Sequence, residues 1–237
     1  HIAWLKYPYL LIHHGLFLYL VILPDSSSSQ SLPSSPPLII AKHKIITSSS
    51  SLAHHHQQIT SWDTIIEESP PSTTSPFFGW VLMGLSKGDL IAFQIIPSSS
   101  SSIIKRIEKP VITFAQITDR SSTSTSPQYG PALSIVKINP VCPNVVIVYH
   151  GLPLKLMTAW DISTSKPLKR YMLRDVPPVV CIAWHPKGEK FFSGHEDGTV
   201  AFWLFKNDKT PLLSFSVSGS FADISRPIKL CYTKAII

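Results

Sequence analysis

The stretch that decides the fold is Phe191–Trp203, which reads FFSGHEDGTVAFW. Two short runs rich in aromatic and β-branched residues flank a polar turn, which is the sequence pattern of a β-hairpin. The turn ends at Gly198, and a glycine at this position predicts a positive φ. Asp197 stands where its carboxylate can accept hydrogen bonds from the amides of the turn. We therefore predict two antiparallel strands, the second of which closes on an aromatic side chain.

The same pattern recurs twice nearer the N-terminus. One copy, Trp80–Phe93, reads WVLMGLSKGDLIAF, and its turn glycine also stands five residues before the closing aromatic residue. Another copy, Val145–Asp161, reads VVIVYHGLPLKLMTAWD, with Gly151 as the expected turn glycine. Trp160 and Trp203 are 43 residues apart, and one blade of a β-propeller takes about 40–45 residues. The repeat therefore has the length of a propeller blade.

An alternating apolar segment precedes two of the three hairpins. Ser134–Pro140 and Val180–Gly188 both run into an Asn-Pro or His-Pro turn, and Arg226–Tyr232 is expected to begin a further unit. A four-stranded sheet cannot bury both faces alone, so neighbouring units are expected to stack. We predict an all-β fold, a partial WD-repeat β-propeller with about three blades of a seven-bladed ring and Ser-rich loops. Ten residues are expected to be structural determinants of the blades: Trp80, Gly84, Gly88, Trp160, Asp161, Trp184, His185, Asp197, Gly198 and Trp203.

The repeat also sets the expected domain organisation. Residues 1–53 are apolar and Ser-rich and carry no copy of the repeat, whereas residues 54–237 are expected to form the partial propeller. A Ser/Thr insertion near residues 118–131 cannot bury apolar area and is expected to be disordered. The chain begins with His1 instead of Met, which indicates a piece of a longer protein.

The apolar segment Ile2–Leu23 allows more than one interpretation. A signal peptide or a membrane anchor has to be considered, although the longest unbroken apolar run is shorter than the roughly 20 residues of a membrane helix. Two strands around a turn at His13–Gly15 fit the sequence at least as well.

Composition and charge exclude several classes of protein. Charged residues make up 15% of the chain, against about 25% in an average soluble domain. The formal net charge is +7, but the basic residues form no stripe with interleaved aromatic residues, so nucleic-acid binding is not favoured. Weak attraction to an anionic membrane or an acidic partner is more plausible. Cys142, Cys181 and Cys231 cannot form a disulfide framework, which fits a reducing compartment.

The sequence offers few candidates for catalysis or metal binding. His54–His56 has no Cys or carboxylate at the spacing of a tetrahedral site, so we expect a solvated loop instead of a metal site. His195–Asp197 has residues suited to acid–base chemistry, but its position favours a hydrogen-bonded turn. No nucleophile elbow and no phosphate-binding loop are present. We therefore expect no catalytic residue, no metal and no cofactor.

The motifs together resemble a known family. Phe78–Phe93 is similar to an early blade of the lethal giant larvae / tomosyn family of WD-repeat, syntaxin-binding proteins. Ala183–Gly188 followed by His195–Gly198 resembles a later blade of the same N-terminal propeller. The resemblance covers about residues 54–96 and 132–235 and depends on the order and spacing of the motifs.

This resemblance implies a function for a longer protein with two seven-bladed propellers. It implies a non-enzymatic scaffold that binds plasma-membrane SNAREs of the syntaxin type and regulates vesicle docking and fusion in exocytosis and polarised secretion. Rab GTPases and myosin are implied as further partners. The implied location is the cytoplasm, with peripheral association at the plasma membrane. The alternatives are a generic WD-repeat adaptor for complex assembly in another pathway, a propeller-fold hydrolase and a membrane-anchored protein.

Overall fold

The fold was analysed in a computed structural model of the chain. The structure describes residues 2–6, 9–14, 17–22, 38–44, 58–66, 79–96, 103–106, 132–171, 173, 176–206 and 210–216. Every element of secondary structure in these ranges is a β-strand. The strands are β1 (Ile2–Lys6), β2 (Tyr9–His14), β3 (Phe17–Ile22), β4 (Leu38–Lys44), β5 (Ile59–Ile66), β6 (Gly79–Leu85), β7 (Leu90–Ile96), β8 (Ile103–Arg106), β9 (Leu133–Ile138), β10 (Val145–His150), β11 (Leu156–Asp161), β12 (Lys166–Tyr171), β13 (Val179–Trp184), β14 (Lys190–His195), β15 (Thr199–Leu204) and β16 (Leu213–Ser216).

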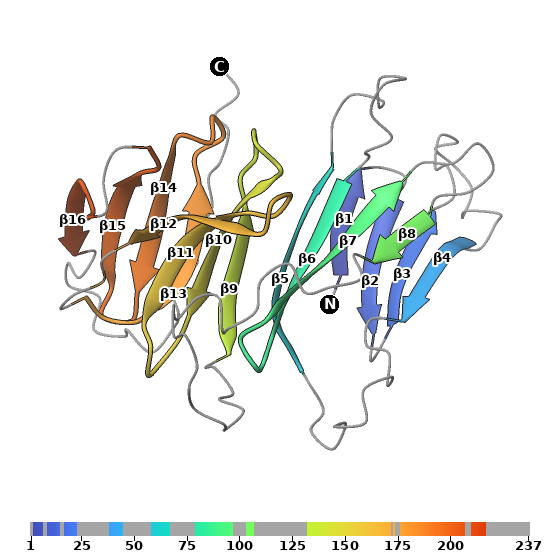
Figure 1. The fold of residues 1–237 in the computed structure, drawn as a ribbon, viewed down its shortest axis with the longest axis horizontal. Helices are drawn as coiled ribbons and strands as arrows, with labels where there is room; N and C mark the ends of the chain where they lie inside the picture. Colours follow the sequence, from blue (N-terminus) through green and yellow to red (C-terminus); the bar gives the residue numbers. More distant parts are fainter. Residues whose placement is uncertain are drawn as a thin grey trace, which may run out of the picture. The chain divides into compact units, whose positions relative to one another are not determined.

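Four consecutive strands make each sheet. We name the sheets A (β1–β4), B (β5–β8), C (β9–β12) and D (β13–β16), and in each one the spatial order of the strands follows the sequence (Figure 1). The pairings in sheets A, C and D are antiparallel throughout, as is that of β7 with β8. The all-β prediction is therefore confirmed. The repeat in the sequence corresponds to sheets B, C and D, and sheet A is one four-stranded sheet more than the repeat indicated.

The alternating pattern predicts strands at Trp80–Gly84, Asp89–Ile95, Ala132–Ile138, Val145–Tyr149, Val179–Trp184, Lys190–Ser193 and Thr199–Phe205. The structure agrees with each to within two residues. The predicted strands correspond to β6, β7, β9, β10, β13, β14 and β15. The N-terminal hairpin is also confirmed, because β2 and β3 pair antiparallel with His14 opposite Phe17. No helix among the residues that the structure describes is long and apolar enough to cross a membrane.

The chain divides into two compact units, and sheet B contributes to both. The first unit comprises residues 1–56, 64–81 and 92–108, and it contains sheet A and parts of sheet B. Within this unit β4 lies against β8, and the Lys42 ammonium stands 4.2 Å from the centre of the Phe17 ring. A cation this close to an aromatic face is attracted to it.

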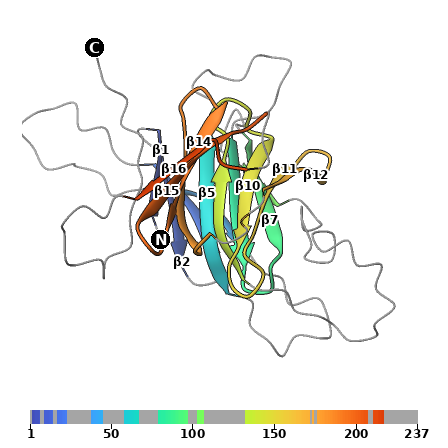
Figure 2. The ribbon, with the colours of Figure 1, turned by 90° about the vertical axis from the view of Figure 1, so that its left-hand side faces the viewer.

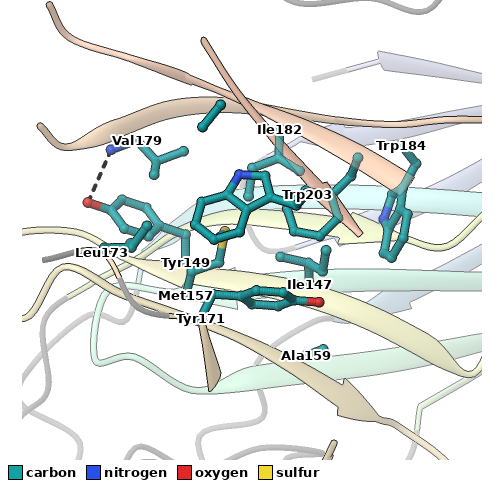
Figure 3. Packing of buried hydrophobic residues seen from close by; sticks show 12 residues of the cluster. Ile147, Tyr149, Met157, Ala159, Tyr171, Leu173, Val179, Ile182, Trp184 and Trp203 are labelled. Carbon is teal, nitrogen blue, oxygen red and sulfur yellow. Dashed lines mark hydrogen bonds between the residues drawn. The ribbon is translucent and has the colours of Figure 1, made fainter. Parts of the chain in front are cut away.

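The second unit contains sheets C and D, residues 57–63, which include the first part of β5, and residues 82–91 around the β6–β7 turn. Its core lies where sheet C packs against sheet D (Figure 3). Sheet C contributes side chains of β10 and β11, including Ile147 and Met157, and sheet D contributes Trp184, Phe191 and Trp203. The first strands of the two sheets, β9 and β13, also lie next to each other.

Aromatic rings fix the packing of this core. The Phe191 and Trp203 rings are stacked with centroids 5.8 Å apart, and Tyr171 meets Trp203 edge to face at 5.4 Å. Such pairs add about 0.5–1.5 kcal/mol each beyond the burial of apolar area. The tryptophan that closes the repeat in sheet D, Trp203, is therefore buried between sheets C and D, where it stabilises their packing.

Several sequence predictions fall on residues outside the described ranges. These are the strand expected at Arg226–Tyr232, the His54–His56 cluster, Cys231 and the insertion near residues 118–131. The domain boundary between residues 53 and 54 stays a prediction.

Candidate interaction site and its supporting network

A chain of buried hydrogen bonds connects the strands of sheet D. The Trp203 indole N–H donates to the Ser193 hydroxyl at 2.8 Å, and the Ser193 hydroxyl lies 2.9 Å from His195 Nε2. On the other side of the ring, His195 Nδ1 lies 2.8 Å from the carbonyl oxygen of Pro177, just before β13. The side chains of Ser193, His195 and Trp203 are fully buried. The network thus ties β15 and β14 to the segment that leads into the sheet.

The partners at the two ends indicate the directions of these hydrogen bonds. The Pro177 carbonyl can only accept, so His195 Nδ1 carries the proton and donates it. In the neutral ring Nε2 then accepts, and the Ser193 hydroxyl donates to it while accepting from Trp203. In this arrangement each of the polar atoms of Ser193, His195 and Trp203 has a hydrogen-bond partner, as a buried network requires.

The Ser193–His195 pair has the spacing of a nucleophile and its base, but not the accessibility. A catalytic serine needs an oxygen that reaches substrate. Here the hydroxyl is fully buried and already accepts the indole N–H of Trp203. The geometry therefore supports a structural role for this pair.

Sheet C carries a rearranged version of the same network. The Trp160 indole N–H donates to the Thr158 hydroxyl at 2.8 Å on its own strand. His150, at the position that His195 occupies in sheet D, donates from Nε2 to the carbonyl oxygen of Gly88 at 3.0 Å, in the β6–β7 turn. His150 is fully buried, and this desolvation lowers its pKa, with the hydrogen bond to Gly88 acting in the opposite direction.

The turns after β14 and β11 are held by aspartates. Asp197 accepts the backbone N–H of Thr199 at 2.9 Å and the Thr199 hydroxyl at 2.7 Å. Asp161 accepts the backbone N–H of Ser163 at 2.9 Å in the same way. These bonds lower the pKa of Asp197, and they lower that of Asp161 against an opposing effect of desolvation. Both carboxylates therefore act within their turns.

The β10–β11 turn departs from the sequence prediction. Gly88 and Gly198 have φ of 86° and 82°, as expected, but Gly151 is not among the residues with positive φ. Lys155, five residues before the closing tryptophan, takes that conformation instead, with φ of 46°. The assignment of Gly151 as the turn glycine was therefore wrong. Its lack of a side chain serves another purpose, because a Cβ there would lie 2.8 Å from the Ser134 hydroxyl oxygen.

Polar contacts connect the first strands of sheets B, C and D, which are β5, β9 and β13. Asp63 within β5 accepts the backbone N–H of Ile138 at 2.8 Å and pairs with Lys137 at 3.2 Å. Buried Asn139 donates to the Gly188 carbonyl at 2.8 Å, and the Trp184 indole donates to the Lys137 carbonyl at 3.1 Å. Different polar contacts therefore connect β5 to β9 and the end of β9 to sheet D.

The remaining predicted determinants have clear positions. Trp80 lies buried in β6, and Gly84 on the same strand has no room for a Cβ beside Ser61 and Leu133. The ring of His185 accepts the backbone N–H of Lys187 at 3.1 Å in the turn before β14.

The most exposed apolar loop of the described residues is the β10–β11 turn, residues 151–155. Leu152 is 64% exposed and Leu154 is 36% exposed. The loop is nevertheless fixed, since the amides of Leu154 and Lys155 both donate to the Gly151 carbonyl at 3.0 Å. An ordered loop that holds leucines in solvent is a candidate contact site for a partner. We call residues 151–155 the leucine loop.

The described residues hold no group of His, Cys, Asp and Glu that could bind a metal ion. Cys142 and Cys181 are both free thiols.

Comparison with known proteins extends only to the fold, and no family model matches the chain. The chain is similar to chains in solved structures of Polycomb Repressive Complex 2. One is described as ctPRC2, with 9% identity, and two are from Chaetomium thermophilum, one of them a humanized mutant, with 8% identity. Each has a TM-score of 0.55 and matches 90% of this chain. The chain spans 38–41% of the length of the chains it matches. Together with the four four-stranded sheets, which are antiparallel in A, C and D, this likeness is consistent with a partial propeller-like fold.

Two features of the site were not found from the sequence. The sequence predicted His195 as part of a turn. Its ring also forms hydrogen bonds with the Ser193 hydroxyl and with the Pro177 carbonyl, just before β13. The leucine loop lies outside the repeat motifs, so the repeat did not indicate it. A pair of leucines around a proline in a hairpin turn, where polar residues are usual, was the available signal.

Proposed function

We propose that the chain is part of a WD-repeat β-propeller that acts as a non-enzymatic scaffold and binds plasma-membrane SNAREs of the syntaxin type, with the leucine loop as one contact. The observation that carries the scaffold role is the exposed apolar loop on a rigid sheet. The choice of SNAREs depends on the resemblance of the repeat motifs to the lethal giant larvae / tomosyn family. Regulation of vesicle docking and fusion, and association with Rab GTPases, myosin and the plasma membrane, belong to the same proposal.

The buried networks support a scaffold more than an enzyme. The Ser193–His195 pair is enclosed, and the Asp161 and Asp197 carboxylates are occupied by their own turns. Among the described residues, the leucine loop is available to another molecule, and Leu152 and Leu154 provide apolar contact area there. Apolar side chains on a preorganised loop lose little conformational entropy on binding.

The test is a pull-down of the full-length protein with the cytoplasmic segment of a syntaxin-type SNARE. The variant Leu152→Ser/Leu154→Ser removes the apolar contact of the loop, and Leu168→Ser on β12 is the matched control, because Leu168 is 49% exposed and lies outside the loop. We expect the double variant to bind clearly less SNARE than the control does. Binding no stronger than that of an unrelated propeller would refute the SNARE assignment, and equal binding by both variants would refute the role of the loop.

A second candidate is a generic WD-repeat adaptor for complex assembly in another pathway. The same exposed loop favours it equally, because an apolar contact does not identify its partner. Loss of a different captured protein on substitution of Leu152 and Leu154, together with no SNARE binding, would support this candidate.

A further inference from the structure

The leucine loop is built on the backbone of Gly151, its first residue. The Gly151 carbonyl accepts the amides of Leu154 and Lys155, both at 3.0 Å. A Cβ at Gly151 would lie 2.8 Å from the Ser134 hydroxyl oxygen, so the backbone approaches β9 closely there. Figure 2 shows β10 and β11, the two strands that the loop joins, side by side. A contact that fixes the position of Gly151 therefore also fixes the exposed leucines.

The pairing of β10 with β9 is irregular just before this residue. Tyr149 pairs with Ile135 on β9. The next residue, His150, pairs with Leu133, so one residue of β9 is passed over. Such an irregularity locally disrupts the hydrogen-bond ladder. Main-chain pairing with β9 therefore holds the end of β10 less firmly than the middle of the strand.

The side chain of His150 supplies a further attachment at this point. It is fully buried, and its Nε2 donates to the Gly88 carbonyl oxygen at 3.0 Å. In the β6–β7 turn, the Gly88 amide donates to the Leu85 carbonyl at 2.9 Å. The Ser86 amide of the same turn donates to the Gln58 carbonyl at 2.9 Å. All of these residues belong to the second unit, so a side chain ties the residue before the leucine loop to a fixed neighbouring turn.

The corresponding histidine of sheet D has different contacts. His195 bonds to the Pro177 carbonyl at the lead-in to its own sheet and to the Ser193 hydroxyl. The short turn that follows it is held separately by the Asp197 carboxylate. The leucine loop contains no carboxylate of its own. The anchor beside this loop is therefore the His150 side chain.

We propose that His150 is a positioning residue for the leucine loop and that protonation of its ring releases the loop, so that partner binding there weakens on acidification. The inference deepens the proposed function and rests on it for the identity of the partner.

The chemistry of the buried ring gives the direction of this effect. Nε2 carries the proton that it donates to Gly88, because a carbonyl can only accept, so acidification adds the second proton at Nδ1. Burial disfavours the charged ring and lowers the pKa of His150, which outweighs the opposing effect of the Gly88 hydrogen bond. A ring that is released into solvent regains an ordinary pKa of about 6.5. Below that pH, proton binding favours the released ring over the anchored one.

Neighbouring charges do not account for this behaviour. The described titratable groups on the elements around His150 are Lys87 and Asp89 in the β6–β7 turn, Asp63 on β5, Lys137 on β9, Tyr149 on β10, Lys155 in the loop and Asp161 on β11. Asp63 and Lys137 pair with each other, and Lys87 and Asp89 have opposite charges. Asp161 bonds within its own turn, and the Tyr149 hydroxyl accepts the Val179 amide of β13. The main cause of the pH sensitivity is therefore the desolvation of the ring.

Hydrogen exchange of the free protein tests the anchor without any partner. The readout is the protection of residues 151–155, taken relative to an unstructured peptide at the same pH. We expect this protection to fall by up to about tenfold between pH 7.5 and pH 5.5, because the released ring titrates near pH 6.5. His150→Gln keeps an N–H that can reach Gly88 but does not titrate, so its protection should stay constant. His150→Ala removes the donor and should lower protection by about fivefold at both pH values, and His185→Gln, in a turn of sheet D, is the control that should behave like the original chain.

Binding of the cytoplasmic segment of a syntaxin-type SNARE is then measured at the same two pH values. We expect the dissociation constant of the original chain to rise by up to about tenfold at the lower pH and that of His150→Gln to stay constant. Constant protection of the loop in the original chain, or SNARE binding that changes equally with pH in both proteins, would overturn the inference. An equal loss of protection in β14 and β15 would show that the whole unit opens and would also overturn it. The predicted loss of protection without SNARE binding at either pH would confirm the anchor and refute only the partner of the proposed function.

Discussion

Replacement of Ser193 by alanine tests the buried network most sharply. The substitution removes one oxygen atom, so it leaves almost no cavity. It does, however, take away the acceptor of the Trp203 N–H and the donor to His195 Nε2. Both remaining groups are fully buried, and each buried polar group left without a partner costs about 1–3 kcal/mol. Because the two groups belong to one network and their costs do not add fully, we expect a loss of about 2–4 kcal/mol.

The assay is urea unfolding followed by tryptophan fluorescence. With a slope of about 2 kcal/mol per molar urea, the midpoint is expected to fall by about 1–2 M. Ser214→Ala is the matched control, because Ser214 is exposed and lies in the same cross-strand row, opposite Ala201, which itself faces Ser193. Its effect is expected to stay within about 0.5 kcal/mol.

A second variant tests whether the loss of stability comes from the broken hydrogen bonds or from any change in the core. Trp203→Phe keeps an aromatic ring but removes the indole N–H, so adding Ser193→Ala to it leaves one fewer group unsatisfied. The serine substitution is then expected to cost less than it does in the original chain. If Ser193→Ala shifts the midpoint no further than Ser214→Ala, the account of the network is wrong.

Three further predictions concern stability. Burial lowers the pKa of His150, so the folded state favours the neutral ring. The associated stability is complete above the unfolded pKa of about 6.5 and decreases as the pH falls below it. His150→Gln should therefore flatten the fall of the urea midpoint between pH 7.5 and pH 5.5, and an unchanged slope would contradict this. The Tyr171 hydroxyl is buried without a hydrogen-bond partner among the described residues, so Tyr171→Phe should raise the free energy of unfolding by about 1 kcal/mol; a loss would show that the hydroxyl is satisfied. Lys155 has φ of 46°, so Lys155→Gly should stabilise the chain by about 0.5–1 kcal/mol, measured by thermal unfolding, and destabilisation would rule out strain at this residue.

The hairpins could be predicted from the sequence because their signals are local. Alternation of apolar residues, a glycine at the end of the turn and a closing aromatic residue all lie within Phe191–Trp203, and β14 and β15 follow them closely. The turn glycines Gly88 and Gly198 were predicted for the same reason, since their conformation depends on neighbours in the chain.

The remaining features depend on residues that are distant in the sequence. His195 forms a hydrogen bond with the Pro177 carbonyl, 18 residues away, and His150 forms one with the Gly88 carbonyl, 62 residues away. Spacing within one repeat contains no information about such pairs. Gly151 was misassigned because a glycine required for close approach to Ser134 looks the same in the sequence as one required for a positive φ. Sheet A carries none of the repeat motifs, so only one of its hairpins was predicted, and its four-stranded topology was not.

The central claim is that the leucine loop of this scaffold binds a syntaxin-type SNARE, and the most direct test is the affinity itself. Isothermal titration of the full-length protein with the cytoplasmic SNARE segment should give a measurable dissociation constant. The account predicts that Leu152→Ser/Leu154→Ser raises this constant by about tenfold, or 1.4 kcal/mol, while Leu168→Ser leaves it unchanged. The absence of binding heat with the original chain, or the same constant for all three proteins, would contradict the account.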